Sequence, residues 1–572
     1  MSTGTSVARL AHTLRWLRAR QLWGQLRVRL RTAIERPKRW DDNAPGLPGF
    51  RWSHSRDFLP PGVQDNHADD LREGRFHFLQ RSESLGWPPR WSVPELPRLW
   101  EYNLHYFEFL WALPFEDGRL VALDWIQDHP LGARQTGWEP YPISLRSVNW
   151  CGYFLDRHRE ATQGDADFVS LLWASLHRQL SWLSKHVETH LLGNHLFENA
   201  AALAFCGSCF PGNPGDAWLR QGLAILDREL SEQVLADGGH FERSPMYHAR
   251  ITYLLQLLVA TGVDELVSRA EEPLARMRAA LALLCHPDGE IALLNDSALE
   301  IANRPSEIGV PAVEAAAFAL PDTGYYGARS RHGHHVICDA APIGPDYQPG
   351  HAHGDLLAFE LSLAGSRVIV DAGVFDYEPG PRRDYCRSTR AHNTVEIEGQ
   401  DQCEFWGAFR VARRGRPLGV EWQVLEEAGF RLTASHDGYQ RLPGRPLHQR
   451  VFRWHADGVL LVRDRVQASS EVSICSRLHL HPDCEIVERS ASSVLVAQPE
   501  GECRIHFAGP GSLDVEPWRY SPRFGEEREA RALRWSLRGR DSEFGFCVAA
   551  GGESLSFDLQ AGSRRGGVGF GF

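Results

Sequence analysis

The spacing of apolar residues along the chain changes near residue 320. From about residue 95 to that point, apolar side chains recur three and four positions apart, which is typical of amphipathic helices. This spacing predicts helices over residues 146–160, 166–190, 194–206, 216–236, 246–262 and 266–286. Because short Gly-, Pro- and Asp-rich segments separate them, these helices indicate a bundle, a solenoid or a toroid.

From about residue 330 the period of the pattern is two. Segments such as HVICDA, LLAFELSL and SRVIVDAG alternate apolar and polar residues and are bounded by turn residues. Many short strands of this kind predict an antiparallel β-sandwich. The predicted fold class is therefore α+β multidomain, with a helical domain over residues 46–320, a β-sandwich over 321–572 and an N-terminal extension over 1–45.

The N-terminal extension is strongly basic. Residues 1–39 contain ten Arg and Lys residues and one acidic residue, Glu35, and leucines recur from Leu10 to Leu30 at roughly helical spacing. We therefore predict a basic amphipathic helix, which would rest on an anionic membrane surface, on a partner protein or on the acidic body of the protein itself. The segment lacks the apolar stretch and cleavage site of a secretory signal, so we expect a cytoplasmic protein, with the periplasm as the alternative.

Composition removes one class of function and suggests another. The net charge of −11 and the pI near 6.2 argue against a general nucleic-acid partner, because a basic surplus would be needed to offset phosphate repulsion. Fourteen of the 19 Trp residues lie before residue 220, which suits either sugar-binding faces or seams between helices. The eleven Cys residues form no paired CxxC units, so we interpret most of them as small buried residues in a reducing environment.

Two clusters in the helical half have the residue types of a catalytic site. In GNHLFENAAAL, Asn194, His195 and Glu198 crowd the start of an apolar helix, with His195 and Glu198 on one face. A helix cap would explain Asn194 alone but not the whole set. Tyr247, near the start of a later helix, is by itself more typical of packing and gains weight only from its association with this cluster.

Two further clusters lie in the strand-rich half. His351, His353 and Asp355 occupy alternate positions before a strand, Asp371 ends the next strand, and His392 follows in RRDYCRSTRAHNTVEIEG. Two imidazoles and one carboxylate from this set suit Zn²⁺. The alternative for each His taken alone is a hydrogen-bonded core or surface residue.

The order of these motifs resembles that of the heparinase II/III-like polysaccharide lyases. NHLFEN is followed about fifty residues later by Tyr247 and then by GHAHGD, VIVDAG and RSTRAHNTV. The resemblance implies an incomplete (α/α) toroid followed by an antiparallel β-sandwich. Upstream, LWEYNLHYFEFL and GWEPYPISLRSVNW look like the aromatic entry of the family's toroid. Together with the Arg-rich segment after Asp371, they supply the candidate substrate-binding residues Tyr102, His105, Trp138, Arg146, Asn149, Trp150 and Arg387.

The resemblance also implies a mechanism and a role for each matched residue. These lyases remove the C5 proton of a uronic acid and break the bond at C4 by β-elimination. Asn194 and His195 match the groups that neutralise the substrate carboxylate, with Glu198 orienting them. Tyr247 matches the base and acid, His351 matches a second base, and Tyr385 is a candidate for leaving-group chemistry. The matched zinc ligands, which hold one structural ion, are His353, Asp371 and His392.

The expected partner is a uronate-containing polysaccharide. The acidic balance favours a non-sulfated or lightly charged chain such as a bacterial exopolysaccharide, while alginate-like and glycosaminoglycan-like chains stay open. Two other classes compete. One is a glycoside hydrolase on an α-toroid that uses Glu198 with Glu242 or Asp237 as its carboxylate pair. The other is a non-catalytic polysaccharide-binding or exopolysaccharide-biosynthesis protein.

Overall fold

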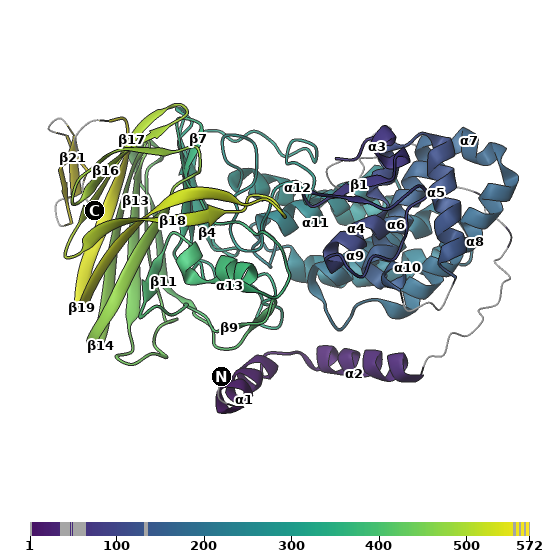
Figure 1. Ribbon diagram of the computed structural model, residues 1–572, viewed down its shortest axis with the longest axis horizontal. Coiled ribbons are helices and arrows are strands. Elements are labelled where there is room, and N and C mark those ends of the chain that lie inside the picture. The colour runs from purple at the N-terminus through teal and green to yellow at the C-terminus, as the bar shows by residue number, and fades with distance from the viewer. Residues whose placement is uncertain are drawn as a thin grey trace.

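The computed structural model describes residues 3–34, 46, 49, 65–130, 135–552, 556–559, 562–565 and 568–570. It confirms a helical N-terminal part and a β-rich C-terminal part, which lie side by side along the long axis of the molecule (Figure 1). Within the described residues, none of the helices combines the length and the apolar character that crossing a membrane requires.

Nine helices, α4 to α12, build the described helical part, and each predicted helix has a counterpart among them. They are α4 (Arg98–Tyr106), α5 (Phe115–Asp128), α6 (Pro140–Trp150), α7 (Arg159–Gly164), α8 (Ala166–His186), α9 (Gly193–Cys209), α10 (Gly215–Gln233), α11 (Pro245–Ala260) and α12 (Asp264–Leu283). Shorter turns are η1 (Glu108–Ala112), η2 (Thr136–Trp138) and the π-helical η3 (Cys151–Arg157), which continues α6. The apolar faces of these helices share one core, in which Trp100, Trp125 and Trp150 are fully buried, so packing explains these three tryptophans.

A small unit that the hydrophobic pattern does not predict precedes α4. It consists of α3 (Ala68–Arg72) and the antiparallel hairpin of β1 (Arg75–Phe78) and β2 (Arg81–Ser84). Phe76 and Phe78 turn inward from β1 and join the helical core against Phe109. The hairpin therefore belongs to the helical part although its period is two.

The β-rich part contains two antiparallel sheets that share a hydrophobic core. The smaller has the order β3-β4-β5-β6-β7, with β3 (Ala316–Leu320), β4 (Tyr325–Arg329), β5 (His335–Asp339), β6 (Phe359–Leu363) and β7 (Ser366–Ile369). The larger has the order β11-β12-β13-β14-β19-β17-β16-β15, with β18 paired to β19 and β8 to β14. Its strands are β8 (Val395–Ile397), β11 (Pro417–Val424), β12 (Phe430–His436), β13 (Leu447–His455), β14 (Val459–His479), β15 (Glu485–Arg489), β16 (Ser493–Gln498), β17 (Gly501–Ala508), β18 (Ser512–Tyr520) and β19 (Arg528–Ala550).

Minor elements complete this part. They are α13 (Pro381–Arg387), η4 (Thr389–Ala391), η5 (Glu426–Ala428), the pair β9 (Phe405–Trp406) and β10 (Arg410–Val411), and the sheet of β20 (Ser556–Asp558), β21 (Gly562–Arg565) and β22 (Val568–Phe570). The loops between β5 and β8, including α13, face the helical part and carry the His- and Arg-rich motifs (Figure 1).

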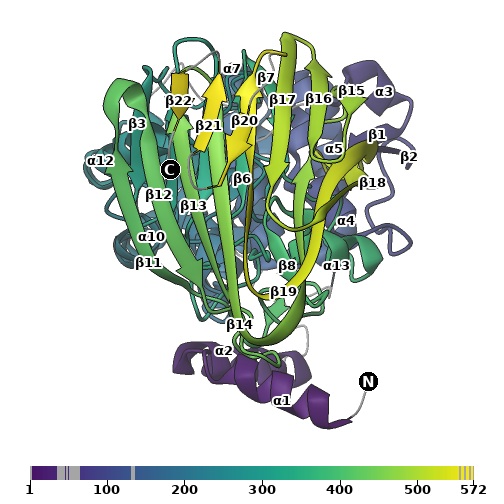
Figure 2. The same ribbon diagram turned by 90° about the vertical axis from the view of Figure 1, so that its left-hand side faces the viewer.

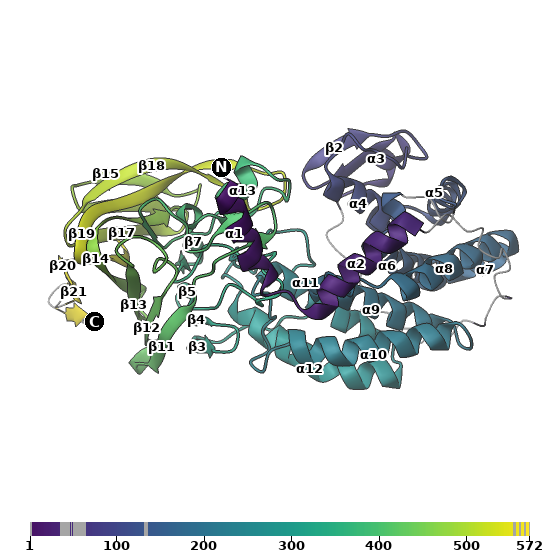
Figure 3. The ribbon, with the colours of Figure 1, turned by 90° about the horizontal axis from the view of Figure 1, so that it is seen from below.

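The N-terminal extension forms two helices where the sequence predicts one. These are α1 (Thr3–Leu14) and α2 (Ala19–Ile34), and the rest of the predicted extension, residues 35–45, lies outside the described residues. The Gln21 side chain accepts a hydrogen bond from the Arg18 backbone N–H at 2.9 Å, and this bond helps to start α2 after the break. Both helices run along the underside of the molecule, α1 below the β-rich part and α2 below the helical part (Figures 1 and 3).

Candidate functional site

A cavity of about 500 Å³ lies between the helical and β-rich parts, and residues of both parts line it. Asn194 and His195 at the start of α9, Tyr247 in the first turn of α11 and His351 in the loop between β5 and β6 all line this cavity, together with Tyr102 of α4. The volume is within the range of small-molecule binding sites. Three segments that are remote in sequence thus bring four of the six predicted catalytic residues to one place, beside the predicted substrate-binding residue Tyr102.

Unusual backbone geometry sets the start of α9. Leu192 and Gly193 both have positive φ angles, 66° and 56°, which is costly for a residue such as leucine. A Cβ on Gly193 would lie 2.4 Å from Gln348 Nε2 and 2.6 Å from Glu242 Oε1, so only glycine fits. The buried Glu242 carboxylate accepts the Asn194 backbone N–H at 3.0 Å. This sharp turn aims the first side chains of α9 at the cavity.

Replacing Gly193 by alanine is expected to lower elimination activity at least tenfold, because the added Cβ must displace Gln348 or Glu242 and shift Asn194. Gly164→Ala, at a position where an added Cβ would meet only open space, is the matched control and should leave activity unchanged. Initial rates on the cleaved polymer, with circular dichroism for folding, measure the effect. Full activity of Gly193→Ala would show that the turn does not position the site.

Asn194 and His195, the first polar residues of α9, differ in their hydrogen bonds. Asn194 Oδ1 is buried and has no hydrogen-bond partner among the described residues, so the amide keeps an unused acceptor. His195 Nδ1 lies 3.2 Å from Glu188 Oε1, and the imidazole ring packs against Tyr141. Burial works to lower the pKa of His195, but the Glu188 carboxylate outweighs it and the net shift is upward. The His195 imidazole, whose charged form is favoured, is therefore suited to meet an anionic group, while Asn194 Oδ1 could accept a hydrogen bond from a protonated or hydroxyl group beside it.

Tyr247 lies against His351, with ring centroids 4.0 Å apart. Ser244 caps α11 by accepting the Tyr247 backbone N–H at 3.2 Å, so the helix start holds the residue in place. The Tyr247 hydroxyl is 3.1 Å from the hydroxyl of Tyr377, which also lines the cavity. Burial, followed by the neighbouring Tyr377, raises the pKa of Tyr247 well above its ordinary value. The phenol consequently holds its proton at neutral pH.

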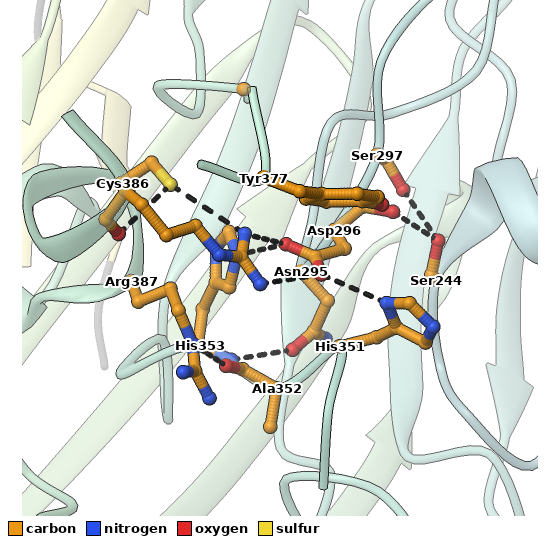
Figure 4. A network of polar contacts seen from close by, with 12 residues as sticks. Ser244, Asn295, Asp296, Ser297, His351, Ala352, His353, Tyr377, Cys386 and Arg387 are labelled. Atoms are coloured by element: carbon orange, nitrogen blue, oxygen red, sulfur yellow. Dashed lines mark hydrogen bonds and ion pairs between the residues drawn. The ribbon is translucent and has the colours of Figure 1, made fainter. Parts of the chain in front are cut away.

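Asp296, which the sequence motifs do not single out, connects the candidate groups (Figure 4). Its Oδ2 lies 2.8 Å from His351 Nδ1 and its Oδ1 lies 2.8 Å from His353 Nε2. Arg383 donates to both carboxylate oxygens. Burial works to raise the pKa of Asp296, but Arg383 and the two imidazoles hold it well below its usual range. One ionised carboxylate thus orients both histidines.

A cluster of potential metal ligands lies directly behind His351. Ligand atoms of the buried residues His353, Asp371 and His392 all lie within 4.8 Å of one another. His353 Nδ1 and His392 Nε2 are buried and lack a hydrogen-bond partner among the described residues. Unpaired imidazole nitrogens are costly to bury, so these two nitrogens and the carboxylate fit a metal of the zinc type. The bond from His353 to Asp296 is the outer-shell contact that orients a ligating histidine.

Zinc affinity is expected to fall as the pH is lowered through about 6, because burial raises the pKa of Asp371 to about 6 and His392 lowers it only in part. Ligation requires the ionised carboxylate, so apparent affinity is greatest above that pH and declines by about tenfold per pH unit below it. Competition with a chromophoric chelator at several pH values measures this. The His353→Ala variant should bind no zinc, and pH-independent binding by the unaltered chain would contradict the expectation.

Most of the predicted substrate-binding residues are not at the cavity. Buried Arg146 donates to Gln179 and to the carbonyls of His105 and Gly137, and Asn149 bonds Tyr106 and Trp111. The members of this predicted set that are buried away from the cavity lining are His105, Trp138, Arg146, Asn149, Trp150 and Arg387. The aromatic entry is thus largely helical core, because large rings packed between helices bury the most apolar area. Only Tyr102 of this set lines the cavity.

Other predicted residues act on the site through their neighbours. Glu198 forms a buried bidentate ion pair with Arg250, whose guanidinium reaches the cavity. Arg387 donates to the carbonyls of Ala352, Gly407 and Ala408, so it holds the loop that carries His351.

Tyr385, the candidate for leaving-group chemistry, belongs to α13 and lies beside Arg390. It is not among the residues that line the cavity, where Tyr377 lies near Tyr247.

The three carboxylates considered for a glycoside hydrolase form hydrogen bonds or ion pairs with other groups of the protein. Glu198 is paired with Arg250, and Asp237 accepts the backbone N–H and the hydroxyl of Thr323 at 2.8 Å each. Glu242 lies 3.4 Å from His351 Nε2 and bonds the backbone of α9. None of these three carboxylates is among the residues that line the cavity, so they do not form the opposed pair that this hydrolase hypothesis requires.

Comparison with known proteins supports the family resemblance. Family models for the heparinase II/III N-terminus and for the heparinase II/III-like C-terminal region match residues 119–307 and 312–556. Heparin-sulfate lyase of Pedobacter heparinus is 28% identical over 383 residues, which cover 60% of this chain and 54% of that lyase. The chain thus spans about half the length of that relative. FtsZ-localized protein C of Caulobacter vibrioides is 26% identical over 546 residues, covering 84% of this chain and 88% of that protein.

Solved structures give the same picture of the fold. A heparinase III structure matches with a TM-score of 0.69 at 17% identity and 86% coverage of each chain. The structure of a heparan sulfate lyase HepC mutant from Pedobacter heparinus matches with a TM-score of 0.61 at 21% identity, covering 92% of this chain and 88% of that one. A helical N-terminal part joined to a β-rich C-terminal part therefore places the chain in the architectural class of the heparinases. With both family models matched in order, the chain belongs to the heparinase II/III-like family.

Proposed function

We propose that this protein is a polysaccharide lyase that cleaves a uronate-containing polysaccharide by β-elimination. The observation that carries the proposal is the meeting of Asn194, His195, Tyr247 and His351 around one cavity. These are the residue types that the chemistry requires, and they come from both parts of the fold. In the finer architecture that we propose, the helices form an incomplete (α/α) toroid and the two sheets form an antiparallel sandwich.

The chemistry begins with a weakly acidic proton. The C5 proton of a uronate is difficult to remove while the neighbouring carboxylate is charged, because the resulting dianion is poorly stabilised. Hydrogen-bond donors near the carboxylate lower this cost. The side chains of Asn194 and His195 supply an amide and an imidazole at the cavity wall, and the raised pKa of His195 favours its charged, donating form.

We assign the two proton transfers to Tyr247 and His351. His351 accepts the C5 proton at Nε2, because its Nδ1–H is directed to Asp296 at 2.8 Å. Glu242 lies 3.4 Å from Nε2, and burial raises the pKa of its carboxyl, which favours the uncharged form beside a basic Nε2. Electrons of the broken C5–H bond form the C4–C5 double bond while the C4–O bond breaks. Tyr247, which holds its proton, donates it to the departing oxygen. A Tyr247 that performs both transfers is the alternative implied by the family resemblance.

The metal has a structural role in this proposal. His353, Asp371 and His392 would hold one Zn²⁺, which when bound would fix the loops of the β-rich part. Asp296 joins this cluster to the catalytic His351 through its two oxygens. A bound metal that fixes His353 would therefore also help to fix His351, through the two bonds of Asp296.

The charge of the cavity favours a substrate of low sulfation. Three arginines line its described wall, and each is ion-paired, Arg98 with Glu139, Arg250 with Glu198 and Arg523 with Glu300. Acidic residues also line it, and burial raises the pKa of one of them, Glu108, to about 7. Because paired guanidinium groups are less available to sulfate, we propose a non-sulfated uronate chain such as an exopolysaccharide.

A panel of uronate polymers tests the proposal. Elimination creates a C4–C5 double bond that absorbs ultraviolet light, whereas hydrolysis creates reducing ends without this absorbance. We expect absorbance to rise faster with a non-sulfated polyuronate than with heparin. New reducing ends without absorbance would show a hydrolase, and a faster rate on heparin would contradict the substrate assignment alone.

A second candidate is a non-catalytic protein of this fold that binds polysaccharide or serves exopolysaccharide biosynthesis. We retain it because the chain also matches 88% of FtsZ-localized protein C, whose name states a location and no cleavage reaction. In that case no polymer of the panel is cleaved. Binding of oligosaccharide would be equal for the unaltered chain and for Tyr247→Phe. An absorbing product that depends on Tyr247 would exclude this candidate.

A further inference from the structure

The two N-terminal helices turn their polar sides toward the protein. On α1, the Thr13 hydroxyl accepts a hydrogen bond from Trp406 Nε1 at 3.1 Å. On α2, Gln21 donates to the Tyr347 carbonyl at 3.1 Å and Arg20 pairs with Glu232 at 3.1 Å. Both the helical part, through Glu232, and the β-rich part, through Trp406, therefore hold this pair of helices.

Close packing accompanies these bonds. The Arg18 guanidinium lies over the Tyr347 ring, 3.6 Å from its centroid. Gly24 lies so near His190 that a Cβ on it would approach the His190 Cβ to 2.6 Å. The side of α2 that carries Arg20, Gln21 and Gly24 is therefore the docked side.

The apolar sides of both helices point the other way. Val7, Leu10 and Leu14 form an exposed stripe on α1. At 100° per residue, the middle of this stripe lies about 90° around the helix from the docked Thr13 and about 130° from Arg9, which pairs with Glu404 at 3.9 Å. On α2 the corresponding stripe contains Leu22, Leu26 and Leu30, with Trp23 beside it. Trp23 is 71% exposed and Val7 68%. The helices run along the underside, at the outer surface of the molecule (Figures 2 and 3).

This orientation is the reverse of that of a helix packed on its own domain, whose apolar face is buried. Docking the polar side leaves the leucines of both helices in water, where exposed apolar stripes are unfavourable. Contiguous exposed apolar surface of this kind marks an interaction site. One face of α1 and of α2 contacts the rest of the protein, and the other face of each helix points outward.

The charge of the N-terminal segment indicates what kind of surface binds the apolar stripes of α1 and α2. Residues 3–34, which comprise both helices and the turn between them, contain seven arginines and no acidic residue, in a chain whose net charge is −11. Arg15, Arg27 and Arg29 are exposed beside the apolar stripes. Leucines and a tryptophan flanked by arginines are the composition of a helix that lies in the interface of an anionic bilayer. We propose that α1 and α2 attach this protein to the surface of a membrane that contains anionic lipids, with their apolar stripes inserted at the headgroup level.

Sedimentation with vesicles tests this attachment. The full chain is mixed with vesicles of phosphatidylcholine alone or of phosphatidylcholine with phosphatidylglycerol. We expect it to sediment with the anionic vesicles and to remain in solution with the neutral ones. The triple variant Leu22→Ser, Leu26→Ser, Leu30→Ser should bind the anionic vesicles at least tenfold more weakly. Added salt should weaken binding of the unaltered chain, because it screens the arginines.

A matched control separates the stripe from exposed apolar residues in general. Leu120, Leu171 and Val487 are comparably exposed on other elements, and their triple serine variant should bind like the unaltered chain. Equal binding to neutral vesicles, or full binding by the variant in α2, would overturn the proposal. So would a dimer in vesicle-free solution that the α2 variant converts to a monomer, since the stripe would then be covered by a second copy. Activity on soluble polymer should be the same in both variants, so its loss or absence bears on the proposed lyase alone.

Discussion

Replacing Tyr247 by phenylalanine is expected to reduce the rate of elimination by about 10²–10⁴-fold, the usual contribution of a positioned proton donor or acceptor. The change removes one oxygen and leaves the ring that packs against His351. It also removes the partner of the Tyr377 hydroxyl at 3.1 Å. The formation of ultraviolet-absorbing product at saturating polymer measures the loss, which should appear in kcat with little change in KM.

Two other tyrosines serve as controls for this result. Tyr377→Phe removes the neighbouring hydroxyl and should cause a smaller loss than Tyr247→Phe, since Tyr377 acts by positioning the Tyr247 phenol. Tyr439→Phe removes a buried hydroxyl that donates to the Val395 carbonyl, away from the cavity, and should leave kcat unchanged. If Tyr247→Phe retained most of the activity, His351 alone would have to account for both proton transfers, and the assigned roles would be wrong.

Replacing Asp296 by asparagine is expected to affect both activity and stability. Asparagine lacks the charge that pairs with Arg383 in a fully buried place, and an uncompensated buried charge costs about 3–5 kcal/mol in the free energy of unfolding. It also loses the carboxylate oxygen that fixes His351 Nδ1, so the basic Nε2 is no longer specified. Misplacement of the base should lower kcat by about 10²-fold or more.

The chain contains a matched control for this variant. Asp464 is likewise fully buried, accepts His448 Nε2 at 2.8 Å and forms a bidentate ion pair with Arg450, but it lies inside the β-rich part away from the cavity. Asp464→Asn should therefore destabilise the protein by a similar amount and leave kcat of the folded protein unchanged. Denaturant unfolding combined with initial rates separates the two effects. An equal fall of kcat in both variants would show that Asp296 serves stability alone.

The halves of the fold could be predicted from sequence because their patterns are local. A helix such as α8 repeats its apolar positions over several turns, and a strand such as β12 alternates buried and half-buried residues, so the local pattern of each segment predicts its own secondary structure. The hairpin of β1 and β2 escaped prediction because its strands have only four residues each, too few for a clear period. The break between α1 and α2 depends on one side-chain bond from Gln21, which the leucine spacing does not reveal.

The candidate site likewise contains residues that the sequence motifs predicted and residues that only the structure revealed. The motif residues Asn194, His195, Tyr247 and His351 reach one cavity, and the motif order also groups His353, Asp371 and His392. Asp296 and Tyr377 lie in loops without a spacing signal, and their roles arise from contacts with residues 55 and 130 positions away. Tyr385 and the aromatic entry residues other than Tyr102 have suitable chemistry but do not line the cavity, because composition does not tell which side of a segment faces a cavity.

The sequence by itself determined the order of the two parts, the basic amphipathic N-terminus and the set of residue types available for chemistry, because periodicity and motif order are properties of neighbouring positions. The tertiary structure alone decided which of these residues share a cavity, which carboxylate joins His351 to the cluster of potential metal ligands, and which face of each N-terminal helix is docked. The physical reason is that burial, pKa and orientation depend on groups brought together across the chain. Arg383, Asp296 and the two histidines acquire their electrostatic relation only when the loops of both parts meet.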